Sequence, residues 1–336
     1  MATGALQWKS GPEVAAARES EPGLLTTQWS PFVPGEIRQW IQPAAVLNCG
    51  RRFIFVFTCG EPGFCHRGHT MLLLLVVVLF APLAALNAAD GPQKILPLPG
   101  EVFVVRGRTA FVILPPVKAA GRPIPWVWYA PTLPNLPGVE EKWMFERFTQ
   151  AGLAVAGIDV GESYGSPDGR ALYSALHEEL TQRRGFAPKA VLLGRSRGGL
   201  MALSWAVENA DKVAGFAGVY PVCNVASYPG LARACGAYHL TAEGLAAQLT
   251  EHNPIDRLAA LAKARVPLFV IHGDVDTVVP LEANSGELRK RYEALGGKMQ
   301  LIIPHGQGHN MWPGFFQCPE LVDFVLTQAD PGRLKP

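Results

Sequence analysis

From residue 95 onward, apolar and polar positions follow two alternating patterns. Short runs of β-branched and aromatic residues are followed by longer stretches in which apolar residues recur every three or four positions. Strands that alternate with helices predict a mostly parallel sheet with helices on both faces, which is an α/β fold. The predicted strands are residues 101–106, 109–114, 125–130, 153–159, 190–193, 213–219, 266–272 and 299–303, and the predicted helices are residues 139–150, 170–183, 196–209, 282–295 and 320–327.

One segment, residues 221–254, interrupts this alternation. It is rich in small residues and directly follows the predicted strand at residues 213–219. We interpret it as a small cap of one or two short helices, inserted into a single folded domain that spans residues 90–336.

The first 70 residues predict no folded domain, because they mix Pro, Gly, Trp and Arg around only one short β-like run at residues 52–57. Residues 71–89 then form an apolar run about as long as the core of a signal peptide, and small residues precede the polar Asp90. We interpret this run as a signal peptide that begins at Met71, which predicts export to the periplasm or the extracellular space. An uncleaved membrane anchor is one alternative. A buried helix is the weaker one, because the run has no polar face.

Composition limits the partners and cofactors. Hydrophobic residues make up 49% of the chain, enough for a sizeable core, and the net charge of +2 is too small to favour nucleic acid or an anionic membrane surface. A membrane partner therefore depends on an uncleaved anchor. The six cysteines lack CxxC spacing, which argues against zinc, and no metal or cofactor is predicted. Cys223 and Cys235 form either a disulfide of an exported protein or two unpaired buried thiols.

Two segments match the G-x-S-x-G pattern of a serine nucleophile on a sharp strand-to-helix turn. Residues 194–198 (GRSRG) follow a predicted strand and lead at once into an apolar helix. Residues 161–165 (GESYG) are followed by residues 166–169 (SPDG), which we read as a turn that delays any helix. This context favours Ser196 as the nucleophile, with Ser163 on a loop near the site.

Acid and base candidates follow in the order Ser, Asp, His, which is the order of α/β-hydrolase triads. Asp274 and Asp276 lie just after a buried strand, and His305 and His309 follow the last one. One acid should face the base while the other caps backbone amides of the loop. The residue chemistry alone leaves both choices open.

Three segments together resemble the α/β-hydrolase superfamily: GRSRGG, HGDVDTVVP and GQGH. The resemblance covers residues 125–327 and is nearest to secreted bacterial esterase-like members, which are related to the dienelactone hydrolase and prolyl-oligopeptidase families. In the pattern HGxxDxxVP the second acid is catalytic, and in GxGH the histidine is the base. The resemblance therefore implies an α/β-hydrolase fold with a triad of Ser196, Asp276 and His309.

The oxyanion hole should combine the backbone N–H of Arg197 with one from the loop after residue 130. This chain departs there from the lipase-like His-Gly-Gly-Gly, and Pro131 has no N–H to donate. We therefore select Thr132, with Leu133 as the alternative. The side chains of Arg195 and Arg197 either bind an acidic substrate group or pair with structural carboxylates, and we favour the carboxylates.

These residues predict a serine hydrolase that cleaves a small-molecule carboxylic ester through an acyl-enzyme. A serine peptidase for short peptides and a non-enzymatic binding protein of the same fold are the alternatives. Because the cap is short, we expect a compact apolar pocket and a preference for short acyl chains. The side chains expected to line that pocket are Trp128, Tyr220, Tyr228, Tyr238, Trp312 and Phe315.

A protein that begins at Asp90 is expected to be soluble, folded and active, because residues 1–89 carry no core-forming periodicity. Thermal unfolding and ester hydrolysis of this shortened protein, measured beside the full chain, check the expectation. Aggregation of the shortened protein alone would mean that the N-terminal segment packs on the folded domain and is not a signal peptide.

Overall fold

The computed structural model describes residues 46–49, 52–55, 93–117 and 121–332. The chain divides into two compact units, residues 1–78 and 79–336. In the first unit, β1 (Val46–Cys49) and β2 (Arg52–Phe55) form an antiparallel hairpin. The apolar run at residues 71–89 lies outside the described residues, so its interpretation stays a prediction. None of the helices within the described ranges is long and apolar enough to cross a membrane.

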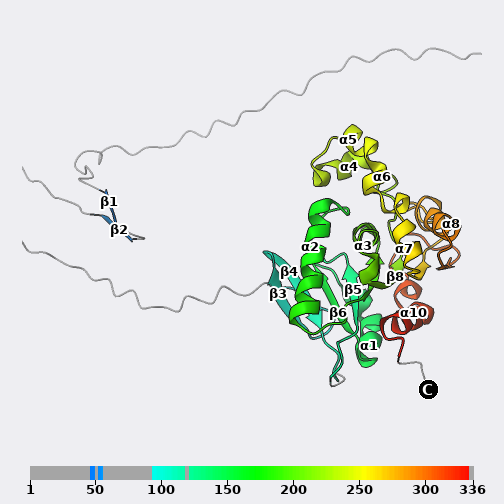
Figure 1. Cartoon of the computed structure of the whole chain (residues 1–336), viewed down its shortest axis with the longest axis horizontal. Helices are drawn as coiled ribbons and strands as arrows, with labels where there is room; N and C mark the ends of the chain where they lie inside the picture. Colours follow the sequence, from blue (N-terminus) through cyan, green and yellow to red (C-terminus); the bar gives the residue numbers. More distant parts are fainter. Residues whose placement is uncertain (1–45, 50–51, 56–92, 118–120, 333–336) are drawn as a thin grey trace, which may run out of the picture. The chain divides into compact units, whose positions relative to one another are not determined.

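The second unit is built on an eight-stranded sheet with the order β10-β9-β8-β7-β5-β6-β4-β3 (Figure 1). The strands from β10 to β6 are parallel, and the β3–β4 hairpin adds antiparallel strands at one edge. The predicted mostly parallel sheet is confirmed. Its strands are β3 (Glu101–Val105), β4 (Arg108–Ile113), β5 (Trp126–Ala130), β6 (Ala154–Ile158), β7 (Ala190–Arg195), β8 (Val213–Val219), β9 (Leu268–Ile271) and β10 (Met299–Ile302).

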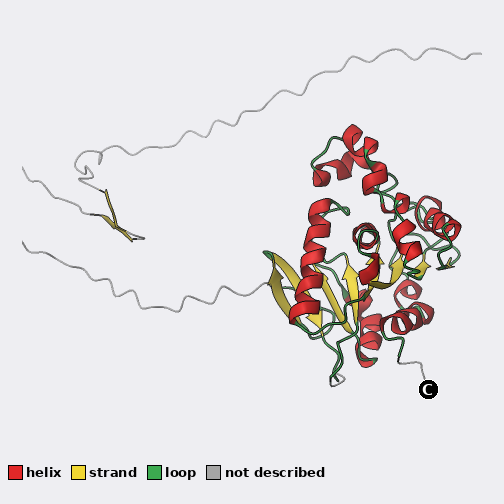
Figure 2. Ribbon diagram, in the orientation of Figure 1, coloured by secondary structure: helices red, strands yellow, loops and turns green. Residues whose placement is uncertain are grey.

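Helices cover both faces of this sheet, as Figure 2 shows. Residues of α2, α3 and α8 belong to one buried apolar cluster, and those of α1 and α10 belong to a second one. The longer helices are α1 (Lys142–Gln150), α2 (Pro167–Glu178), α3 (Arg197–Ala206), α8 (Glu287–Ala294) and α10 (Pro319–Ala329), and the short ones are α4 (Leu231–Ala234), α5 (Ala242–Ala247), α6 (Leu249–His252), α7 (Ala259–Lys263) and α9 (Pro313–Phe316).

Helix α2 begins earlier than the sequence suggested. Its first residue is Pro167, and the hydroxyl oxygen of Ser166 accepts a hydrogen bond from the backbone N–H of Gly169. Serine as N-cap followed by proline is a common helix start. Our reading of residues 166–169 as a turn that delays the helix is therefore wrong.

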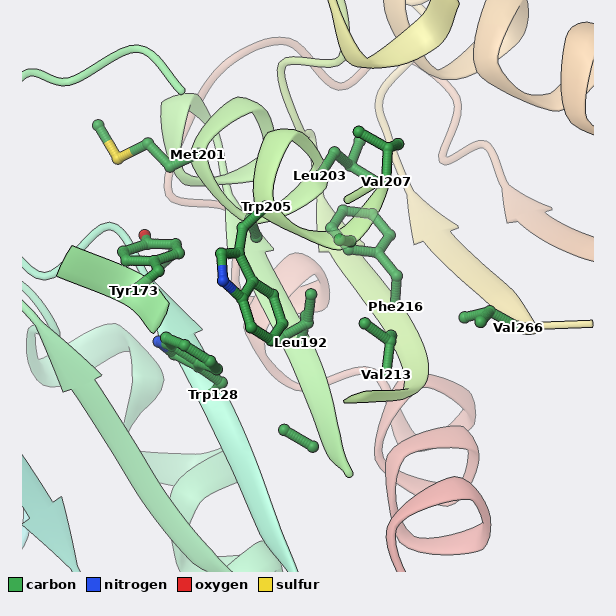
Figure 3. Packing of buried hydrophobic residues seen from close by; sticks show 14 of the residues in the cluster. Trp128, Tyr173, Leu192, Met201, Leu203, Trp205, Val207, Val213, Phe216 and Val266 are labelled. Atoms are coloured by element: carbon green, nitrogen blue, oxygen red, sulfur yellow. The ribbon is translucent and has the colours of Figure 1, made fainter. Parts of the chain in front are cut away.

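The first cluster holds a group of large aromatic side chains between the sheet and helices α2 and α3 (Figure 3). Trp205 of α3 lies 4.8 Å from Trp128 of β5, measured between ring centroids, and Tyr173 of α2 lies 5.0 Å from the same ring. All three are buried. Trp128 is thus a core residue, and its expected place in the substrate pocket is wrong, because its side chain faces the α2–α3 layer.

The segment predicted as a cap carries the three short helices α4, α5 and α6. Figure 1 shows them beyond the ends of α2 and α3. The hydroxyl of Tyr238 donates to the backbone oxygen of Tyr164 at 2.7 Å, and His239 lies 2.9 Å from Asp168. The cap is therefore fastened to the loop after β6 and the start of α2. Cys223 and Cys235 are free thiols, so the disulfide alternative is not realised.

Replacing Trp205 by alanine should lower the free energy of unfolding by about 3–5 kcal/mol, because it empties the centre of the first cluster. The control is Val117→Ala, at an exposed position, which should change the free energy of unfolding by no more than about 0.5 kcal/mol. Denaturant unfolding, followed by far-ultraviolet circular dichroism of the backbone, measures the free energy of unfolding of both variants. Equal small losses would contradict the placement of Trp205 in the core.

Candidate active site

Ser196 lies on a sharp turn between β7 and α3. Its backbone has φ 50° and ψ −125°, a strained conformation for a residue with a side chain. Glycines on either side permit the turn: a Cβ on Gly198 would lie 2.1 Å from the carbonyl carbon of Ala130, and one on Gly194 would lie 2.7 Å from the Cα of Gly199. The motif at residues 194–198 thus has the strand–turn–helix context of a nucleophile elbow.

The structure brings Ser196, His309 and Asp276 together. The Oγ atom of Ser196 lies 2.9 Å from Nε2 of His309, and Nδ1 of His309 lies 2.7 Å from Oδ2 of Asp276. With its proton on Nδ1 donated to the carboxylate, the imidazole offers Nε2 as the acceptor for the serine hydroxyl. This hydrogen-bond chain can deprotonate the hydroxyl as it attacks a carbonyl carbon.

Asp276 is held by four hydrogen-bond donors. Its Oδ1 accepts from the backbone N–H groups of Val278 at 2.9 Å and Val279 at 2.8 Å, and its Oδ2 accepts from His309 and lies 3.3 Å from Nε2 of His272. Burial by itself raises the pKa of the carboxyl, but the bonds from His272, His309 and Val279 outweigh it and hold the pKa of Asp276 well below its usual range. The carboxylate therefore stays charged beside the base.

His272 was not among the site residues predicted from the sequence, and it is fully buried beside Asp276. Its Nε2 lies 2.8 Å from the backbone oxygen of Val279, and its Nδ1 lies 2.7 Å from the hydroxyl of Ser285. The proton therefore sits on Nε2, where it also faces Asp276, and the serine hydroxyl donates to Nδ1. A histidine at the end of a buried strand, four residues before the acid, was the available signal.

The other two acid and base candidates pair with each other. Oδ2 of Asp274 lies 2.6 Å from Nδ1 of His305, and Oδ1 accepts the backbone N–H of Gly306 at 2.7 Å. Although desolvation opposes it, these bonds lower the pKa of Asp274. His305 is 98% exposed and has no contact with Ser196 among the described residues. Asp274 thus joins the two loops that carry the acid and the base.

Of the two predicted oxyanion donors, Arg197 directly follows Ser196 at the elbow, and Thr132 lies on the loop after β5. Thr132 is buried, and the loop that holds it begins with Ala130, whose carbonyl contacts Gly198. Within the described part of the chain, the backbone N–H groups of Thr132 and Arg197 donate to no other residue. Unpaired N–H groups beside a nucleophile are what an oxyanion hole requires, and the assignment stays a prediction.

Both arginines of the elbow pair with carboxylates, as the sequence analysis favoured. Arg195 is buried and lies 2.6 Å from Oε1 of Glu141, which also accepts the hydroxyl of Tyr129 at 2.8 Å. Arg197, at the protein surface, pairs with Glu162. Arg195 therefore connects the elbow to Glu141, just before α1, and Arg197 connects the elbow to the loop after β6.

Ser163 of the second motif is buried and has no histidine partner among the described residues. Its hydroxyl finds no hydrogen bond within this part of the protein. The segment lies after β6 and folds tightly, since Gly161, Tyr164 and Gly165 all have positive φ. The motif at residues 161–165 is therefore a structural loop.

The aromatic pocket predicted from the sequence is only partly realised. Phe315 is fully buried and packs edge-to-face against Tyr220, at 4.9 Å between ring centroids, so it belongs to the core. Tyr220 is also buried, and its ring packs against that of His309, with 4.4 Å between the ring centroids. Trp312, which was predicted to line the pocket, is partly exposed on the loop that carries His309, and Val275, Val278 and Met311 are further exposed apolar side chains on the loops that carry Asp276 and His309.

The sequence matches a known family over more than half of its length. Residues 143–321 match the prolyl oligopeptidase family, and this range includes the whole candidate triad. No curated protein matches the sequence.

Solved structures of the same fold include two peptidases and Est1E, a protein shorter than this chain. A puromycin-hydrolyzing peptidase of Mycobacterium tuberculosis has a TM-score of 0.55 at 16% identity, over 71% of this chain and 40% of its own. Dipeptidyl peptidase 4 of Porphyromonas gingivalis has a TM-score of 0.57 at 15% identity, over 68% of this chain and 35% of its own. Est1E from Butyrivibrio proteoclasticus has a TM-score of 0.51 at 19% identity, over 68% of this chain and 98% of its own. This chain thus spans about two fifths or less of the two peptidases, and these likenesses concern the fold, which is the predicted α/β-hydrolase fold.

Changing Asp276 to asparagine should lower kcat by about 10⁴-fold, because the amide no longer orients His309 in the required tautomer. The same change in Asp274 should cost less than about tenfold, since Asp274 contacts only His305 and the loop backbone. Steady-state kinetics on one ester substrate measures both variants. Equal losses would show that the choice between the two acids is unsupported.

Proposed function

Because the chain belongs to the prolyl oligopeptidase family of the α/β-hydrolase superfamily, we propose that it is a serine hydrolase that cleaves small carboxylic esters. The observation that carries this proposal is the unbroken hydrogen-bond chain from Ser196 through His309 to Asp276. A binding protein that merely shares the fold would have no need of this chain.

In the proposed reaction, His309 takes the proton of Ser196 as Oγ attacks the ester carbonyl carbon. The carbonyl oxygen gains negative charge, which the N–H groups of Arg197 and Thr132 and the N-terminus of α3 stabilise. His309 then gives its proton to the leaving alcohol, and an acyl-enzyme remains. A water molecule, deprotonated by His309, releases the acid. Asp276 keeps its charge throughout and stabilises the imidazolium.

Two features support a small ester as the substrate. The cap helices α4, α5 and α6 have four to six residues each, too few to wall a long acyl tunnel. The exposed Val275, Val278, Met311 and Trp312 offer a limited apolar surface on the loops beside the triad. We therefore propose that short acyl chains are preferred.

Short peptides are the second candidate class. The family match and the two peptidase structures favour it, and the same triad chemistry serves esters and amides. A pair of substrates that share one acyl group, a 4-nitrophenyl ester and a 4-nitroanilide, separates the classes. Hydrolysis of the anilide at a rate comparable with the ester would favour the peptidase.

We also propose that the protein is exported, on the sequence of residues 71–89. An uncleaved anchor would leave the same catalytic domain attached to a membrane. N-terminal sequencing of the protein from its native cell distinguishes the two, because only cleavage produces a chain that begins near Asp90.

Changing Ser196 to alanine should abolish ester hydrolysis and labelling by a fluorophosphonate probe, because both need the nucleophilic hydroxyl. The matched change in Ser163 should leave most of both, since its buried hydroxyl has no base. Mass spectrometry of the labelled protein locates the adduct. Full activity in the Ser196 variant would refute the proposed mechanism.

A further inference from the structure

His272 directly follows β9, and both nitrogens of its imidazole ring have a partner. Nε2 donates to the backbone oxygen of Val279 at 2.8 Å and lies 3.3 Å from Oδ2 of Asp276. Nδ1 lies 2.7 Å from the hydroxyl of Ser285. The side chains of His272 and Asp276 are both fully buried. The ring is therefore held in one orientation, with its N–H group toward the loop that carries the acid.

The two carboxylate oxygens of Asp276 have different supports. Oδ1 accepts from two backbone N–H groups of its own loop, those of Val278 and Val279. Oδ2 faces two imidazoles, at 2.7 Å from Nδ1 of His309 and 3.3 Å from Nε2 of His272. His309 gains and loses a proton in the proposed reaction, so it is not a fixed support for the oxygen that orients it. Among the described residues, His272 is the other donor that Oδ2 has.

Ser285 belongs to a single π-helical turn, Glu282–Gly286, and its neighbour Asn284 fixes that turn. Oδ1 of Asn284 accepts the backbone N–H of Cys223 at 3.0 Å, and Asn284 and Ser285 are both fully buried. Turns of this kind are rare in proteins and occur often at functional sites. The turn thus presents the hydroxyl of Ser285 to Nδ1 of His272 from a well-anchored backbone.

We propose that His272 and Ser285 are positioning residues for Asp276. Ser285 fixes the ring of His272, and His272 holds Oδ2 of Asp276 toward His309 while that base takes up and releases its proton. The inference rests on the proposed function, because it gives both residues a role in the same triad. It differs from a purely structural role, since loss of the N–H group should impair catalysis through Asp276 alone.

The first test compares two replacements of His272. His272→Leu removes the N–H group, whereas His272→Gln keeps an N–H donor on a polar side chain. We expect His272→Leu to lower kcat on one ester by about tenfold with KM little changed, because a hydrogen bond to a charged group is lost. His272→Gln should keep most of kcat. An unchanged kcat in His272→Leu, or equal losses in the two variants, would overturn the inference.

The second test asks whether the effect passes through Asp276. In an Asp276→Asn background, His272→Leu should lower kcat by less than about twofold, because the carboxylate that it positions is absent. Ser285→Ala should lower kcat by about threefold in the wild-type chain and no further in His272→Leu. Losses that simply multiply would show that the two residues do not act through Asp276, and would refute the proposal.

The matched control is His177→Leu, which removes another buried histidine. Its Nε2 lies 2.8 Å from the backbone oxygen of Pro188, and its ring packs near Trp128 in the first cluster. This change should lower the free energy of unfolding but leave kcat of the folded protein unchanged. A loss of kcat equal to that of His272→Leu would mean that removing any buried histidine has this effect, which contradicts the inference.

A spectroscopic measurement separates this inference from the proposed function. Ring-nitrogen NMR shifts of histidine-labelled protein, at a pH where the ring is neutral, report which nitrogen of His309 carries the proton, and they need no turnover. The fraction with the proton on Nδ1 should fall in His272→Leu and keep its wild-type value in His272→Gln. That result supports the positioning role even if the wild-type protein hydrolyses no ester. The wild-type fraction in His272→Leu would refute it.

Discussion

The carboxylate of Asp276 is the group on which the geometry of the candidate site depends. It accepts hydrogen bonds from the backbone of its own loop, from His309 and from the buried His272. One oxygen therefore fixes the acid loop, while the other fixes the base. Because the carboxylate is fully enclosed, each of these bonds acts in a low dielectric, where it is stronger than in water. Losing the charge would release the loop and the imidazole together.

Close backbone approaches make this arrangement possible. A Cβ on Gly273 would lie 2.0 Å from the backbone oxygen of Gln307, and the N–H of Val275 donates to the same oxygen at 3.1 Å. The loop that carries Asp276 and the loop that carries His309 are thus held together by their backbones, in addition to any side-chain contact. Asp274, bonded to His305 and Gly306, adds a second link at the surface. The position of His309 is set by this pair of loops as a unit.

The candidate nucleophile, Ser196, has a separate support. Arg195 forms a buried ion pair with Glu141, and the hydroxyl of Tyr129 donates to the same carboxylate. These bonds connect β7 to the end of β5 and to the start of α1. The loop after β5 contacts Gly198 and extends to Leu133, where Lys94 is bonded.

The sequence by itself determined most of the fold and the choice of the candidate nucleophile. Periodicity located the strands and longer helices of the sheet unit, and residues 194–198 fit an elbow because strand and helix follow directly in sequence. These are local properties, so one chain reveals them. The start of α2 at Pro167 was misread, because Ser166 and Pro167 are as typical of a turn as of a helix N-terminus.

Only the tertiary structure decided which side chains meet across loops. Residue chemistry left Asp274 and Asp276 equivalent, and a family pattern chose between them. The fold separates them because two backbone N–H groups hold Asp276 toward His309, while Asp274 reaches His305. The direction in which Trp128 points, and the hydrogen bond from Lys94 to Leu133, likewise depend on elements distant in sequence. Such contacts leave no periodic signal, since they arise from packing and not from spacing along the chain.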